Sequence, residues 1–215
     1  MTLDTAWARA WVEATADVVR EKRTHLIELD REIGDGDHGE NLDRGFSAVT
    51  AKLDELPTDA RPADVLKMVA TTLISTVGGA SGPLLGTAYL KGAQAIAGQD
   101  ELDAAAVVAF LAAARDGVVL RGKAESGDKT MIDAWTPAVD AATEAASSGA
   151  SPVAVLRAAA DAAVQGAADT EPWVARKGRA SYLGERARGH RDPGAESSSL
   201  IITAAAETAA ATEKG

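Results

Sequence analysis

The sequence contains no cysteine, and only 4% of its 215 residues are aromatic. Without cysteine there is no disulfide framework and no thiolate metal site, and three histidines are too few to favour a zinc centre. No apolar run approaches the length of a membrane span, and the N-terminal residues are too polar for a signal peptide. We therefore expect a cytoplasmic protein with no membrane partner.

Basic residues are also scarce, since 22 Lys and Arg face 32 Asp and Glu and give a net charge of −10. Nucleic-acid binding depends on Lys and Arg that neutralise phosphates, so this balance argues against a nucleic-acid partner. An anionic ligand would have to be met by a metal ion or by locally placed arginines. The length suits one domain, which we take to span residues 1–215.

Alanine is abundant, and apolar residues recur every three to four positions, the period of amphipathic helices. One helix is predicted from Trp7 to Leu29 and the next after Asn41. Others follow Pro62, begin near Pro83, span roughly 103–120, and include Leu200. Ser151-Pro152 is predicted to open a further helix that runs from Val153 to about Ala168. The pattern predicts an all-α fold of about eight helices without a convincing strand. In an antiparallel helical array alternate loops share one end, so we expect several loops to meet at one rim.

The first notable loop carries three aspartates, Asp30, Asp35 and Asp37, separated by glycines that permit sharp turns. Carboxylates brought together repel unless a cation lies between them, and oxygen-only ligands suit Mg²⁺. A solvated acidic turn is the simpler alternative. The loop also fits G-x-G-x-x-G, but a helix rather than a strand precedes it, and its aspartates would repel a pyrophosphate. The Ca²⁺-loop pattern fails because the glycine is at the wrong position.

Three further loops follow. Gly78–Gly82 leads into a helix, and free amides at a helix start attract phosphate, although a plain helix–helix turn is the alternative. In the loop at 121–131, Asp128 is a candidate cap for the next helix. The loop at 175–195 holds six Lys and Arg and the turn signature Asp192-Pro193-Gly194; it is either functional or a solvated basic loop. Together the loops predict a metal-bound polyphosphate and phosphoryl transfer.

Four segments resemble the nucleotide-binding L subunit of dihydroxyacetone kinases over roughly residues 5 to 210: LDREIGDGDHGEN, GGASGPLLGT, RGKAESGDKTMIDAW and ARKGRASYLGERARGHRDPGA. The resemblance implies a closed barrel of eight antiparallel helices with the nucleotide in the loops at one end. It implies that two Mg²⁺ ions are held by Asp30, Asp35 and Asp37, and that Arg179 is catalytic and lies near the transferred phosphoryl group. The implied nucleotide contacts are His38, Gly39, Glu40, Asn41, Ala80, Ser81, Gly122, Met131, Arg179, Asp192, Pro193 and Gly194.

In that family dihydroxyacetone is held on a separate K subunit. A free chain of this length resembles the phosphotransferase-system type, in which bound ADP is a coenzyme recharged by a phosphohistidine on an M subunit, with phosphoenolpyruvate as the ultimate donor. A chain that exchanges ATP, or that serves a related short ketose, is the alternative. A metal-dependent phosphohydrolase and a nucleotide-binding regulator are further alternatives, and a homodimer is left open.

Overall fold

The computed structural model describes residues 3–212, and within them it is all-α. The α-helices are α1 (Thr5–Glu21), α2 (Arg23–Ile33), α3 (His38–Thr50), α4 (Pro62–Thr76), α5 (Ser81–Ala95), α6 (Ala104–Gly122), α7 (Ile132–Ser147), α8 (Pro152–Asp169) and α9 (Pro193–Thr212). Two 3-10 helices, η1 (Leu53–Glu55) and η2 (Arg179–Ala187), lie in connections. None of the helices in this part of the chain is long and apolar enough to cross a membrane.

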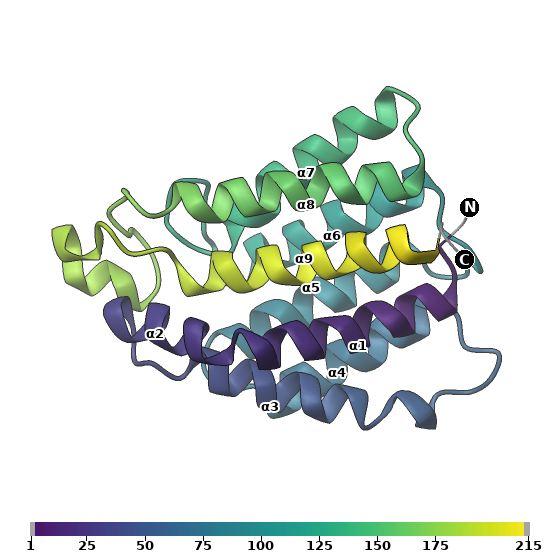
Figure 1. The fold of residues 1–215 in the computed structure, drawn as a ribbon, viewed down its shortest axis with the longest axis horizontal. Helices are drawn as coiled ribbons and strands as arrows, with labels where there is room; N and C mark the ends of the chain where they lie inside the picture. The colour runs from purple at the N-terminus through teal and green to yellow at the C-terminus, as the bar shows by residue number, and fades with distance from the viewer. Residues whose placement is uncertain (1–2, 213–215) are drawn as a thin grey trace.

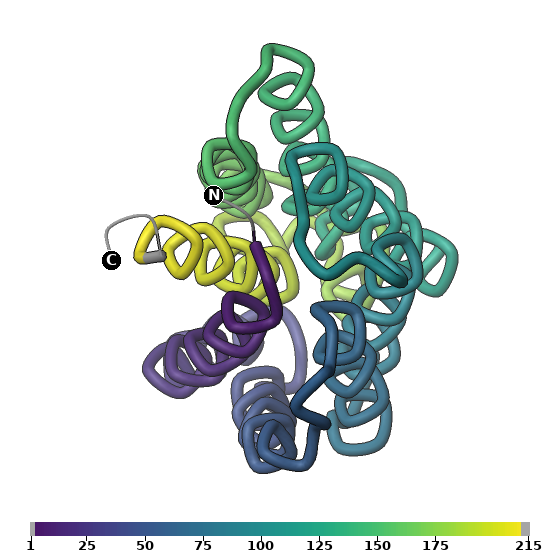
Figure 2. The backbone as a smooth tube through the Cα atoms, turned by 90° about the vertical axis from the view of Figure 1, so that its right-hand side faces the viewer, coloured from purple at the N-terminus to yellow at the C-terminus, as the bar shows by residue number. Residues whose placement is uncertain are grey.

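Eight of the helices, all but α2, form a ring. Each packs against the next in the order α1, α3, α4, α5, α6, α7, α8 and α9, and the ring closes where α9 packs against α1 (Figure 2). Consecutive helices run in opposite directions, so alternate connections gather at one end (Figure 1). That end carries α2 and η2, whereas the two termini lie at the other. The expected shared rim is confirmed.

The core inside the ring is built on α1. Its Trp7 and Trp11 stack with ring centroids 5.3 Å apart, and Trp11 also contacts Tyr89 and Phe110 at 5.6 Å. Both indole N–H groups donate to carbonyls of α9, Trp7 to Ala205 at 3.2 Å and Trp11 to Ile201 at 2.9 Å. Because a buried indole needs a hydrogen-bond acceptor, these bonds fix α1 against α9 and close the ring.

Several predicted boundaries were wrong. The helix from Trp7 to Leu29 is two helices divided at Lys22, and α3 begins at His38 rather than after Asn41. Helix α5 begins at Ser81, two residues before Pro83. Asp192-Pro193-Gly194 is the start of α9 rather than a separate turn, since Asp192 Oδ2 accepts a hydrogen bond from the N–H of Ala195 at 2.7 Å.

The capping role predicted for Asp128 was also wrong. Its Oδ2 accepts the N–H of Glu125 at 2.8 Å, within its own loop. Asp133, in the first turn of α7, accepts the N–H groups of Gly127 at 2.6 Å and Thr130 at 2.8 Å and so orders the loop from the other side. The starts of α4 at Pro62 and of α8 at Pro152, with Ser151 as the N-cap, are confirmed.

Candidate functional site

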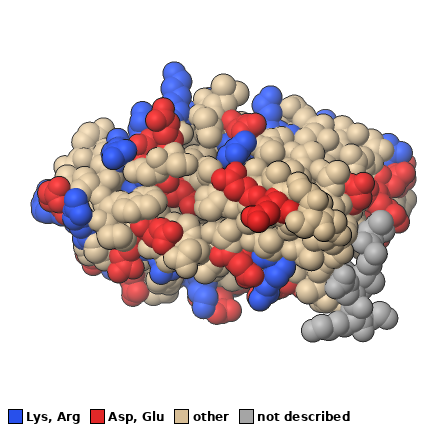
Figure 3. Space-filling model, turned by 90° about the horizontal axis from the view of Figure 1, so that it is seen from above, with Lys and Arg blue, Asp and Glu red and all other residues tan. Residues whose placement is uncertain are grey.

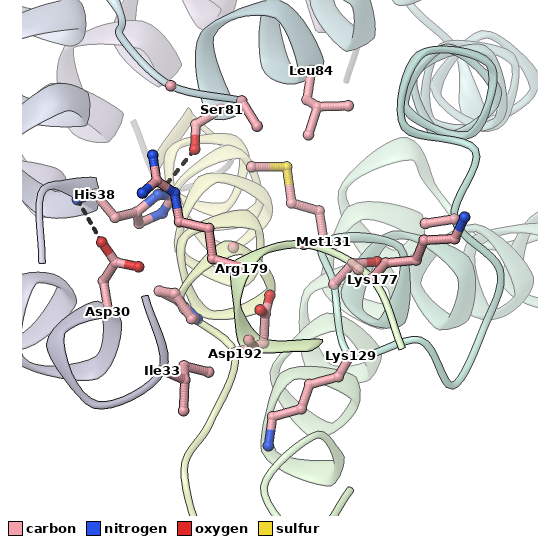
Figure 4. Close-up of a pocket in the computed structure, with 18 of the residues that line it drawn as sticks. Asp30, Ile33, His38, Ser81, Leu84, Lys129, Met131, Lys177, Arg179 and Asp192 are labelled. Atoms are coloured by element: carbon pink, nitrogen blue, oxygen red, sulfur yellow. Dashed lines mark hydrogen bonds between the residues drawn. The ribbon is translucent and has the colours of Figure 1, made fainter. Parts of the chain in front are cut away.

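One pocket lies at the end of the ring opposite the termini and is lined by all four loops that the sequence singled out, together with Val118 of α6 (Figure 4). Its lining residues are Asp30, Ile33, Asp35, Asp37, His38, Gly78, Gly79, Ala80, Ser81, Leu84, Val118, Ala124, Lys129, Thr130, Met131, Ile132, Lys177, Gly178, Arg179, Ala180, Asp192, Pro193 and Gly194. The pocket therefore joins an acidic side, a helix start, an apolar wall and a basic loop.

The acidic side is formed by Asp30, Asp35 and Asp37, each of which offers one carboxylate oxygen within 4.8 Å of the others. Asp30 is buried, and its Oδ2 accepts the N–H groups of Asp37 at 2.9 Å and His38 at 3.1 Å. Only glycine fits at Gly34, because a Cβ there would collide with Asp30 Oδ1. Three carboxylates this close form an oxygen-only ligand set of the kind that Mg²⁺ prefers.

His38 connects the acidic loop to two other segments. Its Nδ1 lies 3.0 Å from Ser81 Oγ and its Nε2 lies 2.9 Å from Ser197 Oγ. Since the Ser197 hydroxyl donates to the carbonyl of Gly194, it accepts from Nε2, which leaves Nδ1 to accept from Ser81. Burial lowers the pKa of His38 to about 4, so the ring is neutral at pH 7 and acts as a fixed spacer between α3, α5 and α9.

The start of α5 forms the next side of the pocket. Ala80 and Ser81 line it, and no side chain caps this helix start. The first N–H groups of a helix lack intrahelical partners, so an uncapped start that faces a pocket is suited to a phosphate. Beside it lies an apolar wall, formed by Leu84, Val118, Ala124, Met131 and Ile132, that could accept a flat aromatic base. Ile33 lies apart from this wall, on the side of Asp30 (Figure 4).

The basic side is the α8–α9 connection. Arg179, at the start of η2, places its guanidinium 2.6 Å from Asp35 Oδ2, and more than half of its side chain is exposed. Asp192, at the far end of this connection, is buried beside the start of α9. Burial raises its pKa to about 7 against the opposing effect of the Ala195 N–H. Arg179 thus lies over the carboxylate cluster, where it can approach an anion bound there (Figure 4).

Two further contacts hold the third loop against the basic loop. The carbonyl of Asp128 accepts the N–H groups of Arg176 at 3.0 Å and Lys177 at 3.4 Å. The side chain of Lys129, which is only 1% exposed, extends from the third loop to the backbone of the α8–α9 connection. These contacts position the basic side relative to Met131 on the apolar wall.

The arrangement agrees with comparisons to known proteins. The family model described as DAK2 domain matches residues 32–207. The chain belongs to the DAK2 domain family. It is 45% identical over 187 residues to the ADP-binding subunit of the PEP-dependent dihydroxyacetone kinase of Escherichia coli K12. The matched region covers 87% of this chain and 89% of that protein. It is 38% identical over 211 residues to the ADP-binding subunit of the PTS-dependent dihydroxyacetone kinase of Lactococcus lactis, covering 98% of this chain and all of that one.

A solved structure is also similar. The dihydroxyacetone kinase of C. freundii in complex with AMP-PNP and Mg²⁺ superposes with a TM-score of 0.71 and 27% identity, over 96% of this chain and 34% of that one. This chain therefore corresponds to about a third of that longer kinase. The predicted resemblance to the L subunit of dihydroxyacetone kinases and the predicted all-α fold are both confirmed.

Most of the predicted site residues of this DAK2 chain line the one pocket, but four do not. Gly39 is buried against the backbone of α2 at Arg23, and Asn41 is buried and accepts a hydrogen bond from Arg44 at 2.6 Å. Glu40 is exposed and lies 3.7 Å from Arg23. Gly122 is the exposed last residue of α6, near Leu84. Their roles as nucleotide contacts stay predictions.

Sequence reasoning missed several residues that line the pocket or support its lining. Leu84 and Val118 were treated as ordinary helix residues, although Leu84 follows the glycine loop by two positions and could have been assigned to its pocket face. Lys129 and Ser197 gave no signal, because a lysine in a polar loop and a serine in a serine run are typical of exposed positions. Both are in fact buried and hydrogen-bonded.

Proposed function

We propose that this chain is the ADP-binding subunit of a phosphoenolpyruvate-dependent dihydroxyacetone kinase, a phosphotransferase. The observation that carries the proposal is the convergence of the acidic cluster, the uncapped start of α5 and Arg179 on one pocket. The L subunits of the E. coli and L. lactis kinases, whose names give them this role, match nearly the whole chain.

The proposed ligand is ADP or ATP with Mg²⁺, the latter held by Asp30, Asp35 and Asp37. The three carboxylates fit the group because their oxygens converge within 4.8 Å and include no nitrogen or sulfur ligand. When bound, Mg²⁺ would supply positive charge that neutralises the phosphates. The resemblance implies two ions, both held by these three carboxylates. Metal titration by calorimetry gives the count.

The remaining groups are assigned by position. The N–H groups at Ala80 and Ser81 would bind phosphate oxygens at the start of α5, and the apolar wall around Met131 would hold the adenine. Pro193 and Gly194, at the start of α9, supply a second helix start, where Asp192 already occupies the first turn. Neutral His38 fixes the distance between the acidic loop and the α5 start.

Arg179 is the proposed catalytic residue. Its guanidinium is paired with Asp35 and extends from an exposed loop, so it can turn from this carboxylate to a transferring phosphoryl group without desolvation. A preorganised donor aimed at the charge that develops in the transition state contributes about 3–4 kcal/mol in a site from which water is excluded. Asp35 would then serve both as a partner of Arg179 and as a ligand of the metal ion.

The partners in this proposal are a K subunit that carries dihydroxyacetone and an M subunit that carries a phosphohistidine. Tyr182 of η2 is 88% exposed and the Arg179 side chain is more than half exposed, so a partner that approaches Arg179 could contact both. A homodimer and a cytoplasmic location stay predictions, tested by mass measurement in solution and by cell fractionation.

The test is reconstitution. The purified chain should carry tightly bound ADP by mass spectrometry, and should form dihydroxyacetone phosphate from phosphoenolpyruvate only when the K and M subunits and the general phosphotransferase proteins are present. Rapid exchange of the bound nucleotide with labelled ATP, and transfer without M, would establish the ATP-exchanging alternative instead. Phosphate release from simple esters by the chain alone would support a phosphohydrolase and refute the proposal.

A matched pair of variants tests the metal site in the same assay. Asp35→Ala should abolish retention of ADP with Mg²⁺, because one of three converging carboxylates is lost. Asp59→Ala removes an exposed aspartate at the opposite end of the ring and should retain nucleotide normally. Normal retention by Asp35→Ala would remove the proposed metal role.

A further inference from the structure

Lys129 is unusual in both its backbone and its side chain. It lies in the 123–131 connection with φ at +63°, a left-handed conformation that residues other than glycine seldom adopt. Its side chain is 1% exposed, although lysine is rarely buried without a partner. No carboxylate of the described residues lies within 4.0 Å of its ammonium. A strained backbone and a buried charge are both costly, so a compensating set of contacts must hold them.

Those contacts are three backbone carbonyls. Lys129 Nζ donates to Ala187 O at 2.6 Å, to Trp173 O at 3.0 Å and to Glu171 O at 3.4 Å. An ammonium has three N–H donors, so all of them are used. Hydrogen bonds from a charged donor are about twice as strong as neutral ones. Burial nevertheless lowers the pKa of Lys129, which agrees with its position away from solvent.

All three acceptors belong to the connection that carries Arg179. Glu171 and Trp173 precede η2, and Ala187 is its last residue, so one ammonium joins the two ends of the segment. Other hydrogen bonds across this base run from the N–H of Gly189 to Glu171 O at 2.9 Å, from Arg188 to Pro172 O at 3.3 Å, and from the N–H of Asp192 to Thr170 Oγ1 at 3.0 Å. Lys129 differs from them in that it reaches the base from the third loop. Within η2 itself Gly184 breaks the helical backbone. The segment is therefore held by the bonds at its base and by the packing of its Ala180 and Ala187 against Ile33 of α2.

Lys129 lines the pocket, but its ammonium is directed away from it. In Figure 4 the Lys129 ammonium points away from Met131 and Arg179, toward the base of the loop. Its three carbonyl contacts connect it to the pocket through the segment that carries Arg179.

We propose that Lys129 is a positioning residue for phosphoryl transfer, which holds the Arg179 segment over the carboxylate cluster by joining the ends of η2. The inference rests on the proposed function for its kinetic consequence, but its structural part, the closure of the η2 segment, stands on the three carbonyl contacts alone. It predicts that loss of the ammonium displaces Arg179 while the metal and adenine sides of the pocket stay in place.

The test compares Lys129→Met with Lys67→Met in the reconstituted kinase. Met keeps the length and apolar stem of lysine but cannot donate, and Lys67 is an exposed lysine on α4 that serves as the matched control. Lys129→Met should lower the transfer rate about 100-fold, since a misplacement of about 1 Å can cost that much, while the Kd for ADP with Mg²⁺ changes less than about threefold. An equal loss of binding and transfer would overturn the proposal.

A double variant separates positioning from general damage. In an Arg179→Ala background, Lys129→Met should lower transfer less than about threefold, because no guanidinium remains to be misplaced. If the two losses multiply, Lys129 does not act through Arg179 and the inference is refuted.

Limited trypsin digestion provides a readout independent of activity. The α8–α9 connection holds six Lys and Arg, so Lys129→Met should speed cleavage there at least about tenfold relative to Lys67→Met, as expected when a local opening becomes easier. Unchanged cleavage refutes the closure of η2, even if the wild-type chain proves to have no kinase activity. Should Lys129→Met fail to fold, Lys129→Gln, a shorter neutral donor, takes its place. It should be cleaved faster than Lys67→Met; unchanged cleavage refutes the closure of η2.

Discussion

Removing the charge of Asp37 should stabilise the metal-free protein and destabilise its metal-bound form. The carboxylate oxygens of Asp30, Asp35 and Asp37 lie within 4.8 Å of one another. At that distance, and at an effective dielectric constant of about 20, two unit charges repel by about 3.5 kcal/mol. Asp35 is compensated by Arg179, and Asp30 by two backbone N–H groups. Asp37 has no ion pair among the described residues, so its charge is the least compensated.

The expected magnitude is smaller than this repulsion. Asp37 is exposed, and salt screens exposed charges, so Asp37→Asn should relieve about 1 kcal/mol at low ionic strength. The Asp37 side chain makes no capping hydrogen bond at the start of α3, so Asp37→Asn removes no cap there. For a chain of this size, about 1 kcal/mol raises Tm by about 2–4 °C.

Magnesium and ADP should reverse the sign. At a ligand concentration of about 100 Kd, binding stabilises the wild type by about 2.7 kcal/mol, and the variant should lose more than half of that gain. The measurement is thermal unfolding at low salt, first with a chelator and then with Mg²⁺ and ADP. Asp103→Asn is the matched control, because Asp103 caps α6 at the opposite end of the ring and should show no metal dependence. A lower Tm in chelator with a full Mg²⁺-dependent gain would refute the reasoning.

Three further predictions concern the same pocket. Arg179→Ala should reduce phosphoryl transfer by about 100-fold or more with little change in ADP affinity, measured by isotope transfer and calorimetry; equal losses would make it a binding residue only. Gly34→Ala keeps all three carboxylates but places a Cβ against Asp30 Oδ1, and should weaken Mg²⁺-dependent retention of ADP; unchanged retention would show that the loop adjusts. In chelator, the free energy of unfolding of Asp192→Asn should decrease by up to about 3 kcal/mol from pH 6.5 to pH 4, because the unfolded chain protonates His38 at its ordinary pKa while the folded ring stays neutral to about pH 4. Urea unfolding measures this loss, and its persistence in an added His38→Gln substitution would assign it elsewhere.

In the wild type this pH dependence should be partly hidden. Burial raises the pKa of Asp192 to about 7, so the folded state holds a proton that the unfolded state releases above its ordinary pKa near 4. The contribution of Asp192 to stability is therefore present at low pH and is lost as the pH rises toward 7. The contribution of Asp192 opposes the contribution of His38 over the same pH range. The Asp192→Asn substitution is therefore needed to reveal the pH dependence that is due to His38.

The sequence predicted the parts of the fold that repeat locally. The three-to-four residue period found the helices, and Pro62 and Ser151 marked two starts because their chemistry acts within one turn. The division at Lys22 escaped detection, since neither glycine nor proline marks it and the apolar pattern continues through α2. The net charge of the chain did not predict where the site lies. Figure 3 shows the reason, because on that face Lys and Arg are interspersed with Asp and Glu.

The site was predictable in outline for a different reason. Antiparallel succession sends alternate loops to one end, so finding the acidic, glycine and basic loops in alternate connections was enough to place them together. Which group faces which was not predictable. Lys129 binds carbonyls 42, 44 and 58 residues away, and a carbonyl looks the same at every position of a sequence. Contacts between a side chain and a distant backbone carbonyl produce no sequence pattern from which they could be predicted. In this pocket, contacts of that kind, made by Lys129, hold the loop that carries Arg179.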